Sequence, residues 1–145
     1  SALAEMLFAH TSGLNACSYC HGIHRVTAET LGIEPGLFEA ILHDVDSAPV
    51  EPRLRPLLHY LRRLTEAPSS VRREDAEAVF AAGWSEDEVH YAVSICAAAN
   101  YFNRVLEGHG IHGDAALWQQ RGRILAENDY VAVHEGCYDP GPAGD

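Results

Sequence analysis

The most distinctive stretch of the sequence is Cys17-Ser18-Tyr19-Cys20-His21-Gly22-Ile23-His24. Residues three and four apart lie on the same face of a helix, so we expect Cys17, Cys20 and His24 to share one. The thiolate is the reactive form of cysteine, and a helix N-terminus or a nearby imidazole favours it. Two thiols one turn apart can also close a disulfide. The segment could therefore supply a nucleophile, a resolving thiol and a base.

Three other interpretations of this stretch stay open from the residues alone. The two cysteines could be buried structural residues. A zinc site normally needs four ligands, and the second half of the usual pattern is missing, since Cys96 and Cys137 stand alone. The spacing from Cys17 to His21 also satisfies the haem-attachment pattern C-x-x-C-H, with Met6 or another histidine as the distal ligand. We favour thiol redox chemistry and expect no metal and no cofactor.

Around this stretch, apolar residues recur at helical spacing and no segment alternates like a strand. Asn15 is interpreted as the N-cap of a helix that Gly32 ends, and Ser85 with Glu88 as a capping box. The predicted helices span 1–13, 16–31, 35–45, 54–64, 72–82, 86–106 and 114–120. The sequence therefore predicts an all-α fold, a compact helical domain of about six or seven helices.

The chain has 145 residues, which predicts a single domain over 1–145. Residues 127–145 are rich in glycine, proline and acidic residues, and we interpret them as a loop-rich C-terminal tail. This tail contains Cys137, for which the sequence indicates either a free thiol or a redox or intersubunit role.

Charge excludes several classes of function. The net charge is −11, from 10 basic and 21 acidic residues, so nucleic acid is not an expected partner. All the basic residues are arginine, which excludes lysine Schiff-base chemistry. No apolar run is long enough for a membrane helix and no signal peptide is visible, so we expect no membrane partner and a cytoplasmic location.

A wider pattern adds to the cysteine motif. Glu5 lies twelve residues before Cys17, and Cys17-x-x-Cys20-x-x-x-His24 follows. This pattern resembles the active-site motif of the alkylhydroperoxidase D-like (peroxidase-related) branch of the carboxymuconolactone decarboxylase superfamily. Three downstream segments are similar to parts of the same family, and the resemblance covers about residues 3–110; the segments are 57–65, 81–89 and 100–104.

The resemblance implies a thiol peroxidase that acts on small organic hydroperoxides or hydrogen peroxide. In that family's scheme Cys20 is the peroxidatic thiol and Cys17 resolves it as a disulfide, while His24 and Glu5 belong to a proton relay. It also implies a lipoylated or thioredoxin-like protein as the thiol reductant, and a homo-oligomer. Tyr19 stands where the characterised alkylhydroperoxidase has histidine, which leaves open whether Tyr19 or His21 takes part in the relay.

Two alternatives to a peroxidase remain at this point. Other members of the superfamily perform carboxymuconolactone decarboxylase-like chemistry, but they lack the cysteine pair. A redox-sensing or metal-binding module without enzymatic activity is the second alternative.

Overall fold

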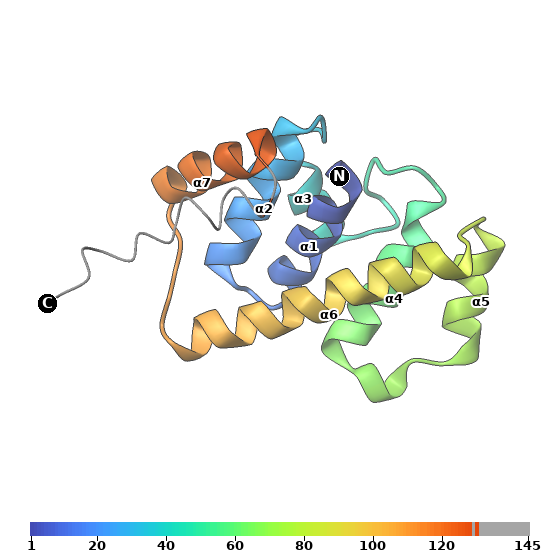
Figure 1. Ribbon diagram of the computed structural model, residues 1–145. Coiled ribbons are helices and arrows are strands. Elements are labelled where there is room, and N and C mark those ends of the chain that lie inside the picture. Colours follow the sequence, from blue (N-terminus) through green and yellow to red (C-terminus); the bar gives the residue numbers. More distant parts are fainter. Residues whose placement is uncertain (129, 131–145) are drawn as a thin grey trace, which may run out of the picture.

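The computed structural model describes residues 1–128 and 130, and the regular secondary structure of this part of the chain is entirely helical (Figure 1). It contains seven α-helices and one short 3₁₀-helix, with no strand among the described residues. The all-α prediction is therefore confirmed. The elements are α1 (Ala2–Leu14), α2 (Ser18–Thr30), α3 (Leu37–His43), α4 (Leu54–Glu66), η1 (Pro68–Ser70), α5 (Arg73–Ala81), α6 (Glu86–Gly108) and α7 (Ala115–Glu127).

The long helix α6 runs the length of the molecule, and the other helices divide into two groups along it (Figure 1). Helices α1 and α2 pack against each other beside its C-terminal half, and α7 covers α2. Helices α4 and α5 lie beside its N-terminal half. Because α1 also contacts α3 and α4, it links the two groups.

The core lies where α1, α3, α4 and α6 meet. Leu57, Leu58 and Leu61 form the buried stripe of α4, as their spacing predicts, and Phe38 and Ile41 of α3 pack into the same cluster. The capping box at the start of α6 is also present, since Glu88 N donates to Ser85 Oγ and Ser85 N donates to Glu88 Oε2. No helix of the described residues is long and apolar enough to cross a membrane.

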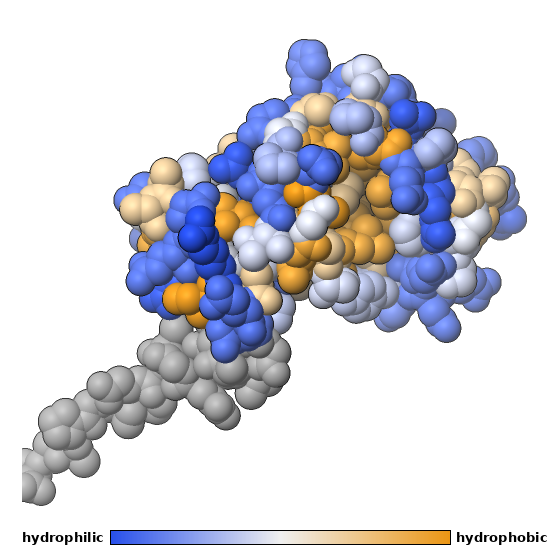
Figure 2. Space-filling model, turned by 90° about the horizontal axis from the view of Figure 1, so that it is seen from above, coloured by the Kyte–Doolittle hydropathy of each residue, from blue (hydrophilic) through white to orange (hydrophobic). Residues whose placement is uncertain are grey.

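Apolar residues are not confined to this core. Seen from above the view of Figure 1, the surface shows hydrophobic residues near its middle and hydrophilic residues around them (Figure 2). A cleft of about 480 Å³ opens among residues of the α2–α3 loop, the start of α3, the α3–α4 loop and α4, including the apolar Ile33, Leu37, Val50 and Leu54.

Several predicted helix boundaries are wrong. The third helix spans Leu37–His43 instead of 35–45, because Gly36, in the left-handed conformation, is its N-cap. Asn15 is not an N-cap; it ends α1, and Cys17 is the N-cap of α2. The last helix extends to Glu127 instead of ending near Gln120. It continues through Gly122 because α7 packs closely on α2 there: a Cβ at Gly122 would lie 2.7 Å from Val26. The predicted tail, with Cys137, lies outside the described residues apart from 127, 128 and 130.

Candidate active site

The turn between α1 and α2 places the first cysteine. Helix α1 ends in a Schellman motif, in which Cys17 N donates to Ser12 O and Ala16 N donates to Gly13 O. The motif requires a left-handed residue, and Ala16 takes this conformation with φ 53°. The chain then leaves the turn extended at Cys17, so α2 begins directly after this cysteine. Both ends of the turn therefore fix the Cys17 backbone.

The two thiols of the motif are free and buried, and each affects the pKa of the other. Cys17 has no exposed surface, whereas Cys20 is 5% exposed. Burial is the largest cause that raises the pKa of both thiols, and the neighbouring Cys17 helps to raise the pKa of Cys20 to about 12. The side chain of Asn103 opposes this rise by donating toward Cys20. At neutral pH both cysteines are therefore thiols, and forming a thiolate needs a proton acceptor.

A buried carboxylate–imidazole pair lies on the neighbouring turns of α1 and α2. His24 Nδ1 is 2.6 Å from Glu5 Oε2, and the imidazole stacks on Phe8 with 3.8 Å between ring centroids. Glu5 is only 4% exposed. Burial acts to raise the pKa of Glu5, but the hydrogen bond and charge of His24, with the hydroxyl of Tyr130, hold that pKa below its usual range. Glu5 is therefore ionised in the folded protein.

The structure thus brings the four predicted site residues together as two pairs. The Cys17 and Cys20 thiols interact with each other, and Glu5 binds His24. Within the described residues no hydrogen bond joins His24 to either thiol, because its Nδ1 points to Glu5. His24 nevertheless follows Cys20 by one turn of α2, so its Nε2 is the nitrogen left for proton exchange.

Tyr19 and His21, the two relay candidates next to the cysteines, make contacts with other parts of the protein. His21 Nδ1 lies 2.9 Å from the carbonyl oxygen of Ala9, and its ring meets Phe38 edge-on, so the side chain is committed to packing α2 against α1 and α3. The backbone of Tyr19 packs under the loop before α7, where a Cβ at Gly113 would lie 2.9 Å from it.

Sequence reasoning missed one residue at this site, Tyr130. Its hydroxyl donates to Glu5 Oε1 over 2.7 Å, although the two residues are 125 positions apart. No local spacing could reveal this contact, because it depends on how α7 folds back over α2.

Behind the thiols, amide side chains form a polar connection to the third cysteine. Asn15 Nδ2 donates to the side-chain oxygens of both Asn103 and Asn100, and Asn100 Nδ2 donates to the carbonyl oxygen of Cys96. Cys96 is fully buried and lies 3.3 Å from Thr65 Oγ1, so it is a cysteine of the core. These contacts fix Asn103 beside Cys20.

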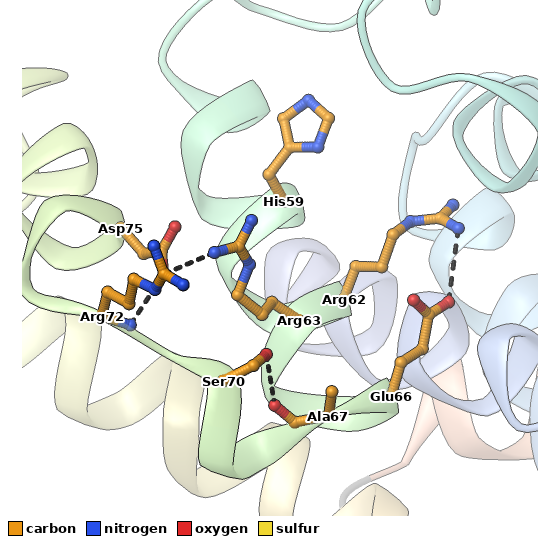
Figure 3. Close-up of a pocket in the computed structure, with 8 residues that line it drawn as sticks. All are labelled: His59, Arg62, Arg63, Glu66, Ala67, Ser70, Arg72 and Asp75. Carbon is orange, nitrogen blue, oxygen red and sulfur yellow. Dashed lines mark hydrogen bonds and ion pairs between the residues drawn. The ribbon is translucent and has the colours of Figure 1, made fainter.

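The molecule also has a charged cleft of about 550 Å³ between α4, η1 and α5 (Figure 3). Its main charges are paired within the protein: Arg62 with Glu66 at 3.5 Å, and Arg63 with Asp75 at 3.1 Å. Arg62 also donates to two backbone carbonyls near the end of α3. These arginines join helices, and we assign the cleft no ligand. No group of three or more potential ligand side chains is arranged to hold a metal ion within residues 1–128 and 130.

Two solved structures share this arrangement of helices. One is an uncharacterised peroxidase-related protein from Silicibacter sp. TM1040, with a TM-score of 0.72 and 23% identity over 81% of this chain and 61% of that one. The other, from Ralstonia eutropha JMP134, is described as an alkylhydroperoxidase AhpD core and peroxidase-related protein. Its TM-score is 0.73, with 23% identity over 84% of this chain and 64% of that one.

The fold is alkylhydroperoxidase D-like. This confirms the fold that the cysteine motif suggested by resemblance. The chain spans less than two thirds of the length of either solved structure. No protein-family model matches the sequence, and no curated protein matches it.

Proposed function

We propose that the protein is a thiol-dependent peroxidase that reduces small organic hydroperoxides or hydrogen peroxide through Cys17 and Cys20. The observation that carries this proposal is a pair of free, buried thiols that affect each other's pKa, with the second thiol one helical turn before His24, whose imidazole binds the ionised Glu5. Each group is of the type that the reaction needs: a nucleophile, a second thiol and a proton acceptor. The fold shared with peroxidase-related proteins supports the same chemistry.

The proposed reaction has three balanced steps. Cys20 first gives its proton to His24. The Cys20 thiolate then attacks the terminal oxygen of the peroxide, and Cys20 becomes a sulfenic acid. The leaving oxygen takes up the proton and departs as an alcohol from an organic hydroperoxide, or as water from hydrogen peroxide. The Cys17 thiol then attacks the sulfenic sulfur, forming a disulfide and water. A dithiol donor supplies two electrons and two protons and restores both thiols.

The structure favours Cys20 for the first step on two grounds. Cys20 retains 5% exposure whereas Cys17 has none, so a peroxide can reach Cys20 with a smaller movement. Cys20 also precedes His24 by one helical turn, whereas Cys17 precedes it by two. The position of Cys17 at the N-terminus of α2 favours a thiolate there, whereas burial raises its pKa.

The partners of the proposed enzyme follow from its chemistry and its surface. A disulfide formed at this site needs a thiol or lipoyl-type reductant protein. We also propose a homo-oligomer, because α6 exposes several large apolar side chains that a second copy could cover; these are Tyr91, Tyr101, Phe102 and Val105.

The test is peroxide consumption with a dithiol donor, comparing the wild type with Cys17→Ser, Cys20→Ser and Cys96→Ser. Cys96 provides a matched control, because it is a buried thiol that lies outside the pair. We expect many turnovers from the wild type and Cys96→Ser, and none from Cys20→Ser. Oxidation that stops after one equivalent despite excess donor would indicate a redox sensor instead. Turnover that survives loss of Cys20 would contradict the proposal.

A further inference from the structure

We propose that Tyr130 is a positioning residue of this site, the third member of a Tyr130–Glu5–His24 chain that keeps Glu5 ionised and His24 in the tautomer that can accept a proton. This inference rests on the proposed peroxidase function. It assigns the additional relay position to the segment after α7 rather than to Tyr19 or His21, the two candidates near the cysteines.

Two short hydrogen bonds build the chain from three distant segments. Tyr130 Oη lies 2.7 Å from Glu5 Oε1, and His24 Nδ1 lies 2.6 Å from Glu5 Oε2. The carboxylate therefore has one partner on each oxygen, which fixes its rotation. Stacking on Phe8 fixes the plane of the imidazole in turn.

The direction of each proton in the chain follows from the ionisation of its members. Because the pKa of Glu5 lies below its usual range, Glu5 is a carboxylate and can only accept. Tyr130 is 56% exposed, but its hydroxyl is partly buried against Glu5. This burial, and then the hydrogen bond and charge of Glu5, raise the pKa of Tyr130, so its hydroxyl stays protonated and donates. His24 must then donate from Nδ1, which leaves Nε2 unprotonated in the neutral ring and able to take a proton.

The packing of α7 on α2 delivers Tyr130 to this position. The indole of Trp118 fills the space above Gly22, where a Cβ would approach it within 2.3 Å. Further along, Thr27 Oγ1 donates to the carbonyl oxygen of Gly122. Helix α7 ends at Glu127. The backbone and side-chain nitrogens of Asn128 both donate to the carbonyl oxygen of Ile124 and so cap the helix. Tyr130 then reaches back to α1.

Removing the tyrosine hydroxyl should therefore act on Glu5 first. A carboxylate that is 4% exposed would lose one of its two donors, so its pKa should rise. The other ionisable groups near this pair are His24 on α2, the amino group of Ser1, and Tyr91 and Cys20 beside the phenol. The substitution leaves all four in place, so a change in the titration of Glu5 reports the lost hydrogen bond.

The experiment compares Tyr130→Phe with the wild type in two measurements, the pH profile of peroxide consumption and the ¹³C NMR titration of the Glu5 carboxyl carbon. We expect the acid limb of the profile and the carboxyl titration to move together to higher pH, by about one unit. Tyr60→Phe is the matched control, because Tyr60 is a partly buried tyrosine of α4 outside this site, and it should leave both measurements unchanged. An unchanged Glu5 titration in Tyr130→Phe would overturn the proposal.

Two further arms separate this proposal from its alternatives. Gly122→Ala should push α7 away from Val26 and shift the Glu5 titration in the same direction as Tyr130→Phe, without touching the hydroxyl itself. A shift caused by Tyr19→Phe but not by Tyr130→Phe would assign the relay to Tyr19 and overturn the proposal. If the wild type consumes no peroxide, the proposed function fails, while the NMR titration still decides whether Tyr130 controls the ionisation of Glu5.

Discussion

His24 Nδ1 lies 2.6 Å from Glu5 Oε2, so a bond across the α1–α2 interface ties a buried carboxylate to an imidazole. The bond makes Glu5 an acceptor that orients His24 and places a negative charge beside the imidazole. In the reaction proposed above, the imidazole takes a proton from a thiol whose pKa burial raises to about 12. The charge of the Glu5 carboxylate favours this proton transfer, because the imidazole becomes positive when it takes the proton.

Glu5→Gln tests this role of the carboxylate. The substitution keeps the size and one acceptor oxygen but removes the charge, so packing should survive. We predict a fall in peroxidase turnover on the order of 10²-fold, the range for loss of acid–base assistance, with thiols that a chemical oxidant can still oxidise. Glu39→Gln is the control, since it removes the same charge from an exposed pair with Arg25. Equal turnover in both variants across pH 6–8 would make Glu5 a structural carboxylate.

The sequence predicts the helices well because their apolar spacing and caps are local signals, as with the stripe of α4 and the Ser85–Glu88 box. Only some residues of the candidate site can be recognised from local sequence spacing. Cys17, Cys20 and His24 follow from spacing along one helix, whereas Glu5 entered through the resemblance alone. Tyr130 carries no signal at all, because its contact with Glu5 spans 125 positions and depends on the packing of α7.

The turn before Cys17 lacks the usual sequence signal of a helix end for a physical reason. A left-handed residue after a helix is usually glycine, and here Ala16 holds that position with φ 53°. Without the glycine signal, Asn15 resembled the N-cap of the next helix. Its side chain instead donates to Asn100 and Asn103, which ties the turn to α6.

Ala16→Gly should therefore stabilise the protein. A non-glycine residue in the left-handed region costs about 1–2 kcal/mol, and the extra chain entropy of glycine offsets about 0.5–1 kcal/mol of the gain. We predict a rise in the free energy of unfolding of up to about 1 kcal/mol, measured by urea denaturation. Ala78→Gly, the same change at an exposed position of α5, should lower it by about 1 kcal/mol. Destabilisation by both changes would show that Ala16 carries no strain.

His10 should make stability depend on pH. Burial, followed in size by the charge of Arg62, lowers the pKa of His10 from 6.5 to about 4, and neither ring nitrogen has a well-formed hydrogen bond. Between these two pH values the unfolded chain binds a proton that the folded protein does not. Stability from this residue is therefore complete above pH 6.5 and is lost as the pH falls to 4, by up to about 3 kcal/mol.

His10→Leu tests this dependence, because it removes the titrating ring from the core. We predict that unfolding free energies measured between pH 4 and 6.5 vary less with pH in His10→Leu than in the wild type. His109→Leu removes an exposed histidine at the end of α6 and should keep the wild-type slope. Parallel slopes for all three proteins would show that His10 does not titrate in this window.

The proposed homo-oligomer can be tested by substituting the exposed apolar side chains of α6. Tyr101 and Phe102 meet edge-on and are 64% and 49% exposed, an unusual exposure for neighbouring aromatic rings. We predict a dimer or larger assembly by light scattering at micromolar concentration, and dissociation by Phe102→Glu. Phe80→Glu, at a 42% exposed position on α5, should leave the assembly intact. A wild-type monomer at these concentrations rejects the prediction.

The roles of the two cysteines can be separated by trapping the sulfenic acid. In Cys17→Ser, Cys20 should still be oxidised once by peroxide, but the sulfenic acid has no partner and should persist or oxidise further. In Cys20→Ser, the serine hydroxyl is far less nucleophilic without a strong base, so turnover should cease. A sulfenic-acid reagent, applied after one equivalent of peroxide, should therefore label Cys17→Ser strongly and Cys20→Ser little.

The reverse result has an equally specific meaning. Cys17 caps the N-terminus of α2, which favours a thiolate, whereas Cys20 has the greater exposure and lies one turn from His24. Strong labelling of Cys17 in Cys20→Ser would show that the helix terminus outweighs access and proximity to the base. Cys96→Ser provides the reference for labelling, because both members of the pair remain and the disulfide should form before the reagent reacts.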